Sequence, residues 1–410
     1  MSKRMMSMAA YGVLAGSLAI HALLFWDDRT LIAKGYPDFT IFYSAGLMIR
    51  QGLGHQLYDE TAQYAVQRQF ASGVVIRHGA LPFNHPPFEA LIFLPLTFLP
   101  YLTAYIVWNL LNLGMLALVT QRLRPHIAIL RSKPLAVWVL GLLTFFPISF
   151  ALLQGQDVIL LFLFQTLAFV ALKKKSDFLA GCWLGMGSFK YHLILPLVVM
   201  IWLGWKRIGV LWGFFGACLG LGAISVTLVG WKEAFRYPGY VLHLEKVMGG
   251  GAILPASMPN LRGLVEGWRD SAGTMDAPHI ATIVLSISLL MWAVLVSRKY
   301  LSESMELRFA LAATVAVLIS YHTFAYDLVL LAIPLFTALD LLFSAPRVAM
   351  KWGLSFWIPA ALLWFTPLYA LLSFRMFHMS LFGGVLVFWL WGIQQRLAST
   401  AQLRRDESIS

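Results

Sequence analysis

One carboxylate stands in front of a short run of apolar residues at helical spacing, and it is the main candidate for chemistry. Asp38 precedes Phe39, Phe42 and Tyr43, which fall on one face of a predicted helix, whereas Thr40 and Ser44 fall on the other face. Such a helix is typical of a segment that lies along a membrane surface. An Asp before a helix is also an ordinary N-cap that satisfies free backbone N–H groups. The two roles do not exclude each other, so Asp38 is a candidate general base.

Further polar groups recur in the segments that interrupt the apolar stretches. They are Asn84, His85, Glu89, Gln154, Gln156, Asp157, Lys190, His192, Asn260, Arg262, His322, Tyr326 and Asp327. His322 and Tyr326 are four apart, which predicts a shared helical face. Each residue has a structural explanation as well: Lys190 could extend to the membrane interface, and Asp157 or Asp327 could cap a helix. Because ionisable groups at membrane depth are costly, their recurrence predicts a pocket with a base and with donors for an anion.

Composition indicates the class of protein. Of the 410 residues, 59% are hydrophobic and 12% are charged, which is too little charge for the surface of a soluble domain. The net charge of +12 comes from basic residues in short clusters between apolar segments, a pattern that favours membrane topology over nucleic-acid binding. Cys182 and Cys218 lie inside apolar segments, where they indicate packing rather than a disulfide or metal framework.

The apolar segments predict an all-α polytopic membrane protein with about twelve transmembrane helices, since roughly 20 apolar residues cross a bilayer. The predicted spans are about 9–26, 101–121, 134–153, 157–172, 178–191, 193–205, 208–230, 279–297, 308–323, 326–343, 352–373 and 380–396. They form a single integral membrane domain over 1–410, with a first outer loop (27–100) that carries amphipathic juxtamembrane helices, a second long outer loop (231–278) and a cytoplasmic tail (397–410). The stretch from Pro86 to Pro100 is expected to dip into the outer leaflet.

The positive charges predict the orientation of these spans. Most of the 31 Lys and Arg residues lie near the N-terminus, in the C-terminal tail and in alternate connections such as 122–133, 173–175 and 206–207. The short connections on the opposite side, 154–157 and 321–326, contain none. The positive-inside rule therefore places both termini in the cytoplasm and the candidate polar residues on the outer face.

Five motifs occur in an order that resembles a known group of enzymes. They are DFTIFYSAG from Asp38, FNHPPFEALIFLPLTFLP from Phe83, QGQ from Gln154, FK at Lys190 and YHTFAYD from Tyr321. Together they resemble the membrane glycosyltransferases of the C-type fold. More narrowly, they resemble glycosyltransferase family 87, the polyprenyl-phosphate-mannose-dependent bacterial mannosyltransferases, over about 38–331.

The resemblance implies an isoprenoid-linked sugar donor that is used on the outer side of the membrane. It also implies that an acidic residue in the first outer loop acts as catalytic base, and this position falls on Asp38. The implied contacts to the donor phosphate or sugar are Lys190, His322, Tyr326, His192, Gln156 and Asp327. The candidate acceptor or loop contacts are Asn84, His85, Asn260 and Arg262.

These residue types suit an inverting transfer. An acceptor hydroxyl attacks the anomeric carbon opposite the departing phosphate, and a carboxylate within hydrogen-bond reach accepts its proton. Because phosphate is already a good leaving group, it needs cations and hydrogen-bond donors rather than a second carboxylic acid. No Asp-x-Asp pair for a metal-bound nucleotide donor occurs in the outer loops. No metal site and no cofactor are therefore predicted, and a metal requirement stays open.

We expect an inverting glycosyltransferase that moves a hexose, with mannose as the expected sugar, from a polyprenyl-phosphate donor to a lipid, glycan or protein acceptor. Its expected place is the outer face of a bacterial plasma membrane, and its expected partners are this donor, a lipid or glycan acceptor and the bilayer, with no nucleic acid. Two alternatives stay open. One is a pentose (arabinofuranose) transferase with a polyprenyl-phosphate donor. The other is a polytopic transporter or lipid-linked-sugar flippase, which predicts inverted repeats.

Overall fold

The computed structural model describes residues 3–73, 81–248, 254–268, 277–344 and 353–409. Within these ranges the chain forms helices and connections and no strand, so the predicted all-helical class is confirmed. Parts of the predicted second outer loop lie outside the described residues. The chain forms two compact units. Unit 1 comprises Met1–Leu116, Val139–Ile159 and Leu219–Val247, and unit 2 comprises Ala117–Trp138, Leu160–Cys218 and Met248–Ser410.

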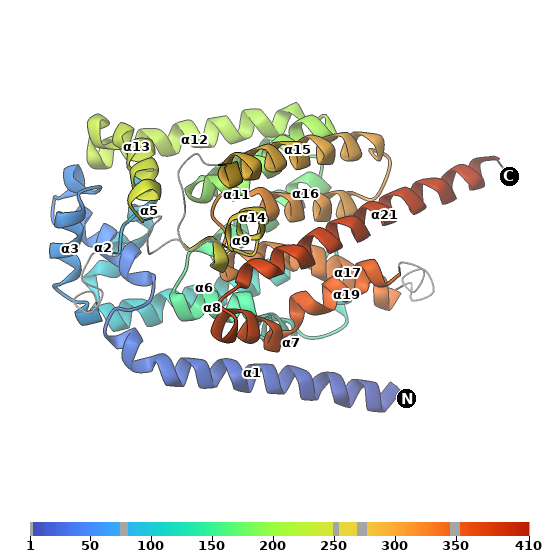
Figure 1. The fold of residues 1–410 in the computed structure, drawn as a ribbon, viewed down its shortest axis with the longest axis horizontal. Helices are drawn as coiled ribbons and strands as arrows, with labels where there is room; N and C mark the ends of the chain where they lie inside the picture. Colours follow the sequence, from blue (N-terminus) through green and yellow to red (C-terminus); the bar gives the residue numbers. More distant parts are fainter. Residues whose placement is uncertain (1–2, 74–80, 249–253, 269–276, 345–352, 410) are drawn as a thin grey trace. The chain divides into compact units, whose positions relative to one another are not determined.

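Unit 1 contains the predicted first outer loop (Figure 1). Its elements are α1 (Lys3–Ala33), α2 (Phe39–Arg50), η1 (Gly54–Gln56), α3 (Glu60–Gln67), α5 (Pro87–Phe93), η2 (Leu94–Phe98), most of α6 (Tyr101–Leu123), the end of α7 (Leu135–Leu143), α8 (Phe146–Gln154), the end of α12 (Ile208–Val229) and α13 (Trp231–Met248). The helix that follows Asp38, α2, packs against α3, α5 and η2.

The solvent-facing polar side predicted for α2 is wrong at Thr40 and Ser44, whereas the location of this helix along a membrane surface stays a prediction. Thr40 and Ser44, on the predicted polar face, are as fully buried as the apolar residues. Their hydroxyls have protein partners: Thr40 Oγ1 donates to Gly35 O (2.8 Å), and Ser44 Oγ accepts from Gln67 Nε2 (3.2 Å). Because polar side chains can be buried when they are hydrogen-bonded, both faces of α2 belong to the core of unit 1.

Close packing fixes α2 against the proline-rich segment. At Gly46, a Cβ atom would lie 2.9 Å from both Leu94 N and Phe93 C, so only glycine allows η2 to approach this closely. At the end of α2, Arg50 Nη1 donates to Thr97 O. The segment predicted to dip into the outer leaflet thus forms two short helical pieces packed on α2, and its entry into a leaflet stays a prediction.

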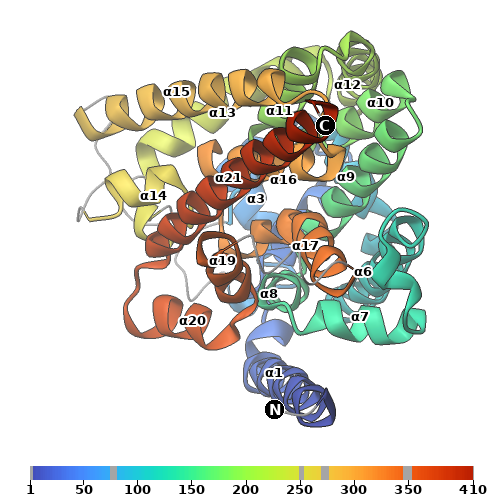
Figure 2. The ribbon, with the colours of Figure 1, turned by 90° about the vertical axis from the view of Figure 1, so that its right-hand side faces the viewer.

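Unit 2 contains the remaining helices (Figure 2). They are η3 (Ala128–Arg131), α9 (Val158–Lys173), α10 (Asp177–Met186), η4 (Ser188–Lys190), α11 (Tyr191–Val199), η5 (Met200–Gly204), the start of α12, η6 (Pro255–Ser257), α14 (Leu261–Glu266), α15 (Ala277–Lys299), α16 (Met305–Ile319), η7 (Ala325–Leu331), α17 (Ala332–Ser344), α19 (Leu354–Trp364), α20 (Thr366–Ala370), η8 (Leu371–Arg375), η9 (Met379–Leu381) and α21 (Phe382–Ile409). At its centre, α16 is buried from Leu307 to Leu318 and packs against α11, α15, α17 and α21.

Several helices are suited to a bilayer. Within the described residues, four are long and apolar enough to cross a membrane: α6, α12, α15 and the continuous η7–α17. Three bent pairs, α7–α8 (78°), α10 with the helical run 188–204 (67°) and α19–α20 (68°), raise the number to seven if each pair is one span. The chain is therefore a membrane protein, and the prediction of twelve spans is not confirmed.

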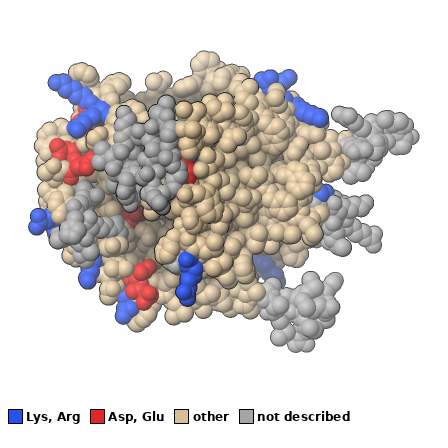
Figure 3. All heavy atoms as spheres, viewed as in Figure 1, with Lys and Arg blue, Asp and Glu red and all other residues tan. Residues whose placement is uncertain are grey.

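The surface agrees with this class. The face drawn in Figure 3 is mostly free of Lys, Arg, Asp and Glu among the described residues. On α15, large apolar side chains three or four residues apart are exposed, namely Ile280, Val284, Ile287, Met291 and Leu295. An exposed apolar stripe along a helix of this length is what lipid contact requires.

Candidate active site

Asp38 occupies the N-cap position of α2, but its carboxylate does not cap the helix. Instead, Asp38 Oδ2 accepts a hydrogen bond from Gln156 Nε2 (2.7 Å). The backbone N–H of Asp38 donates to Gln154 Oε1 (3.3 Å). The side chain is half-buried, so it retains access from outside the protein. The two glutamines of the QGQ motif therefore orient Asp38: Gln154 ends α8, and Gln156 lies on the turn between α8 and α9.

The backbone of this turn requires Gly155. Gly155 has a φ of +60°, a conformation that L side chains rarely adopt, and it closes the C-terminus of α8. A Cβ atom at this position would lie 2.7 Å from Phe39 Cβ. The residue therefore has two reasons to be glycine: its own backbone conformation, and the close approach of the turn to the start of α2.

Two aromatic side chains on α6 hold the turn in place. Tyr105 Oη donates to Leu152 O (3.0 Å) and Leu153 O (2.9 Å), and Trp108 Nε1 donates to Gly155 O (3.0 Å). These acceptors belong to the last turn of α8 and its cap, where backbone carbonyls lack intrahelical partners. Tyr105 and Trp108 thus act on Asp38 through the turn that carries Gln156. These two aromatics were not singled out from the sequence, and their spacing of three on one helix face is the signal that could have indicated a joint role.

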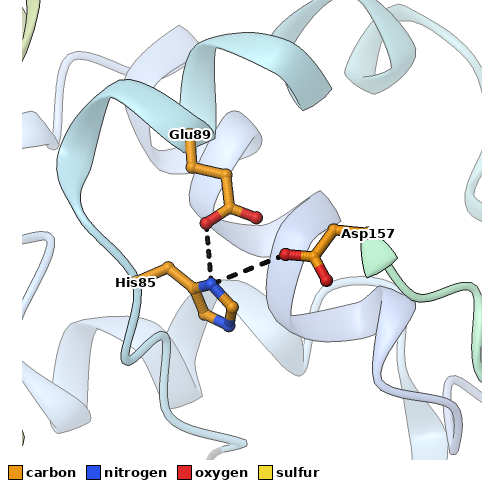
Figure 4. A group of neighbouring side chains, drawn as sticks. All are labelled: His85, Glu89 and Asp157. Carbon is orange, nitrogen blue, oxygen red and sulfur yellow. Dashed lines mark ion pairs between the residues drawn. The ribbon is translucent and has the colours of Figure 1, made fainter. Parts of the chain in front are cut away.

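Next to Gln156 in the chain, Asp157 belongs to a second polar group in unit 1. His85 Nδ1 lies 2.7 Å from Glu89 Oε2 and 3.7 Å from Asp157 Oδ2 (Figure 4). Glu89 and Asp157 are buried, and His85 is nearly so. Asn84, which precedes His85 in the chain, is half-buried. These three ionisable side chains could hold a metal ion, although the sequence predicted no metal site.

The backbone around His85 is anchored by a buried tyrosine. Tyr58 Oη donates to His85 O (2.8 Å), and Tyr58 N–H donates to Glu233 Oε1 (2.9 Å). Burial, with a smaller contribution from neighbouring acidic groups, raises the pKa of Tyr58 well above its ordinary value. Its hydroxyl therefore stays protonated and remains a donor throughout the physiological pH range.

In unit 2, Lys190 is the centre of a buried ion pair. Lys190 Nζ lies 3.1 Å from Asp327 Oδ1 and 5.1 Å from the centroid of the Tyr326 ring. Asp327 Oδ2 also accepts from Phe324 N–H (2.8 Å), which starts η7 at Ala325. The prediction grouped Lys190, Tyr326 and Asp327, and the structure brings these three together.

The segment between α16 and η7 carries the histidine candidates. His192 Nδ1 lies 2.7 Å from Ser320 Oγ, which donates to His322 O (2.7 Å). The rings of His192 and His322 have centroids 6.2 Å apart. The prediction that His322 and Tyr326 share a helical face is wrong, because α16 ends at Ile319 and η7 does not begin before Ala325. His322 lies in the extended connection instead.

Asn260 and Arg262 hold this connection from α14. Asn260 Nδ2 donates to Ser320 O (2.7 Å), while its Oδ1 caps α14 at Gly263 N (2.9 Å). Arg262 is buried, pairs with Glu266 (3.2 Å) and lies over the Tyr321 ring at 4.1 Å. These residues were predicted as acceptor or loop contacts. Their described contacts are within unit 2, where they determine the path of the chain that carries His322.

The two polar groups differ in what they can do chemically. The carboxylate of Asp38 accepts from a neutral amide, which orients a base without protonating it. The ammonium of Lys190, which pairs with Asp327 beside the Tyr326 ring, is a donor of the kind that binds phosphate.

Comparison with known proteins identifies the family. The family model for glycosyltransferase family 87 matches residues 83–320, which include His85, Gln156, Lys190, His192, Asn260 and Arg262, whereas Asp38, His322, Tyr326 and Asp327 lie outside the match. No curated protein and no solved structure matches the chain. Because the match covers more than half of the 410 residues, the chain belongs to glycosyltransferase family 87 and is a glycosyltransferase.

Proposed function

We propose that this glycosyltransferase moves a hexose, mannose, from a polyprenyl-phosphate donor to a hydroxyl group of a lipid, glycan or protein acceptor, with inversion at the anomeric carbon. The observation that carries the proposal is the orientation of the Asp38 carboxylate by Gln156 on a turn that α6 and Gly155 hold in place. A half-buried carboxylate with a fixed orientation is what a general base requires.

The reaction then assigns one role to each polar group. The acceptor hydroxyl attacks the anomeric carbon as Asp38 takes its proton, and the bond from that carbon to the phosphate oxygen breaks. The electron pair of this bond leaves with the polyprenyl phosphate. Lys190, with Tyr326 and His322, provides the positive charge and donors that stabilise the departing phosphate.

The donor chemistry follows from the class of protein. The chain belongs to a family of glycosyltransferases and has four to seven candidate membrane spans. Both features are consistent with a sugar donor that is anchored in the membrane by a lipid. We propose that the fold is of the C type with twelve spans in the bacterial plasma membrane. Both termini would then be cytoplasmic and the reaction would take place on the outer face, where nucleotide sugars are scarce.

The test uses membranes that contain the protein and labelled donors of different class. Polyprenyl-phosphate mannose, polyprenyl-phosphate arabinofuranose and a nucleotide-linked mannose are supplied separately, and labelled products are separated by solvent extraction and chromatography. We expect labelled product from polyprenyl-phosphate mannose, and none in matched membranes that contain Asp38→Asn. Transfer only from the arabinofuranose donor would establish the pentose alternative, and direct transfer from the nucleotide sugar would contradict the proposed donor class.

A further inference from the structure

Three side chains in unit 1 form a mixed nitrogen and oxygen donor set beside the turn that holds Asp38. His85 directly precedes the two prolines that start α5, Glu89 follows in the first turn of that helix, and Asp157 lies between α8 and α9 (Figure 4). One ligand atom from each lies within 4.8 Å of the others. Segments that are far apart in the sequence therefore direct a histidine and two carboxylates to one point.

We propose that His85, Glu89 and Asp157 bind one divalent transition-metal ion, Zn²⁺ or Mn²⁺. Ligands of such an ion lie about 2.0–2.2 Å from it, so two ligand atoms on one ion are about 3–4 Å apart. From His85 Nδ1, the separation of 3.7 Å to Asp157 Oδ2 lies within this range, and that of 2.7 Å to Glu89 Oε2 lies slightly below it. Small side-chain rotations suffice to admit the ion.

The charge of the cluster favours a cation. Glu89 and Asp157 are 0% and 1% exposed, and with both carboxylates ionised the three side chains carry a net negative charge whether the imidazole is neutral or protonated. Ionised groups that are removed from water require compensation by opposite charge. A divalent ion would supply this compensation at the point where all three side chains meet.

The donor set also selects the kind of ion. Mg²⁺ and Ca²⁺ prefer oxygen ligands throughout, whereas an imidazole nitrogen with carboxylate oxygens suits Zn²⁺ and Mn²⁺. Three protein ligands leave at least one coordination position open for water or another oxygen ligand. Asp157 directly follows Gln156 in the chain. An ion bound to Asp157 would therefore also fix the position of Gln156, whose side-chain amide donates to Asp38 Oδ2.

The test measures binding of the metal alone and does not depend on the proposed function. The full-length protein is purified in detergent with its affinity tag removed, stripped with a chelator and titrated with Mn²⁺ by electron paramagnetic resonance, or with Zn²⁺ against a fluorescent chelator. We expect one ion per chain and a rise in the unfolding temperature. Glu89→Gln and Asp157→Asn should each weaken binding by at least about tenfold. Glu60→Gln, on an exposed side chain of α3, serves as the matched control and should not change it.

Specific results would overturn the proposal. Absence of stoichiometric binding by the wild-type protein would show that the cluster shares protons rather than a metal ion, as would unchanged affinity in both carboxylate variants. Should either carboxylate variant fail to fold, His85→Gln gives the same test, because it removes the nitrogen ligand and leaves both carboxylates. Binding by His85→Gln as tight as that of the wild type would equally exclude the site.

Discussion

The surroundings of Asp38 and those of Lys190 compensate charge in opposite ways. Asp38 accepts from a neutral amide, Gln156, on a turn that is held by backbone carbonyl contacts and by the absence of a side chain at Gly155. Lys190 is paired with a carboxylate, Asp327, in the core of unit 2. A neutral donor stabilises a carboxylate less than a cation at the same distance would, which suits the base that we propose at Asp38. A buried ammonium must be stabilised before any ligand arrives, and an ion pair achieves this.

The largest effect is expected from Asp38→Asn. The amide keeps the shape of the side chain and removes the base, so transfer should fall by about 10²–10⁴-fold while the protein remains folded. The rate of transfer is measured with labelled donor, together with the unfolding temperature in detergent. Asp27→Asn, the same change on an exposed carboxylate of α1, is the control and should have no effect. Retention of most of the activity by Asp38→Asn would exclude Asp38 as the base.

Lys190→Ala should chiefly affect stability. It leaves Asp327 buried without its cation, which is expected to lower the free energy of unfolding by about 3–5 kcal/mol. The double variant Lys190→Met with Asp327→Asn removes both charges and should recover much of this loss, yet remain inactive if Lys190 contacts the phosphate. Unfolding is followed by titration with a denaturing detergent in mixed micelles. The control is Lys174→Ala, which changes an exposed side chain. Recovery of activity in the double variant would limit Lys190 to a structural role.

Gly155→Ala tests how the turn is held. A non-glycine residue at positive φ is expected to be less stable by about 1–3 kcal/mol, and the added Cβ also meets Phe39 Cβ at 2.7 Å. Gly52→Ala is a matched control, because Gly52 has a φ of +74° and no atom within 4 Å of its added Cβ. Both variants should lose stability, but only Gly155→Ala should lose transfer activity. Equal activity in the two variants would show that contact with α2 does not orient Asp38.

The smallest expected effect is that of Tyr105→Phe. It removes the hydroxyl that donates to Leu152 O and Leu153 O, and the free energy of unfolding should fall by about 0.5–1.5 kcal/mol. Tyr369→Phe removes a comparable donor in unit 2, from Tyr369 Oη to Leu363 O (2.9 Å). Similar losses of stability are expected, with reduced transfer only for Tyr105→Phe. A decrease in transfer for Tyr369→Phe but not for Tyr105→Phe would contradict the proposed role of Tyr105 in orienting Asp38.

The sequence predicted the all-helical membrane class, the family and the candidates Asp38, Lys190 and Asp327, because composition and motif order depend on local residue types. It did not predict the contact between Asp38 and Gln156. That contact depends on the positive φ of Gly155 and on donors from α6, about fifty residues away along the chain. Spacing along the chain contains no information on either.

The two wrong predictions have local physical causes. Helical periodicity placed Thr40 and Ser44 on a surface, but hydrogen bonds to Gly35 and from Gln67 allow both to be buried. The spacing of His322 and Tyr326 suggested one helix. Asp327 Oδ2 instead accepts a hydrogen bond from Phe324 N–H, so η7 begins after His322. In both cases a tertiary or capping hydrogen bond outweighed the pattern.

The hydrogen bonds that Tyr105 and Trp108 donate to carbonyl groups at the C-terminus of α8 have a consequence in bilayers of different thickness. A helix terminus that accepts hydrogen bonds from a neighbouring candidate membrane span does not need to reach the aqueous phase. If α6 tilts to match a thinner or thicker bilayer, the terminus and the acid beside it should tilt with it as one body. The depth of the proposed base in the bilayer would then be set by protein geometry and not by the position of the water boundary.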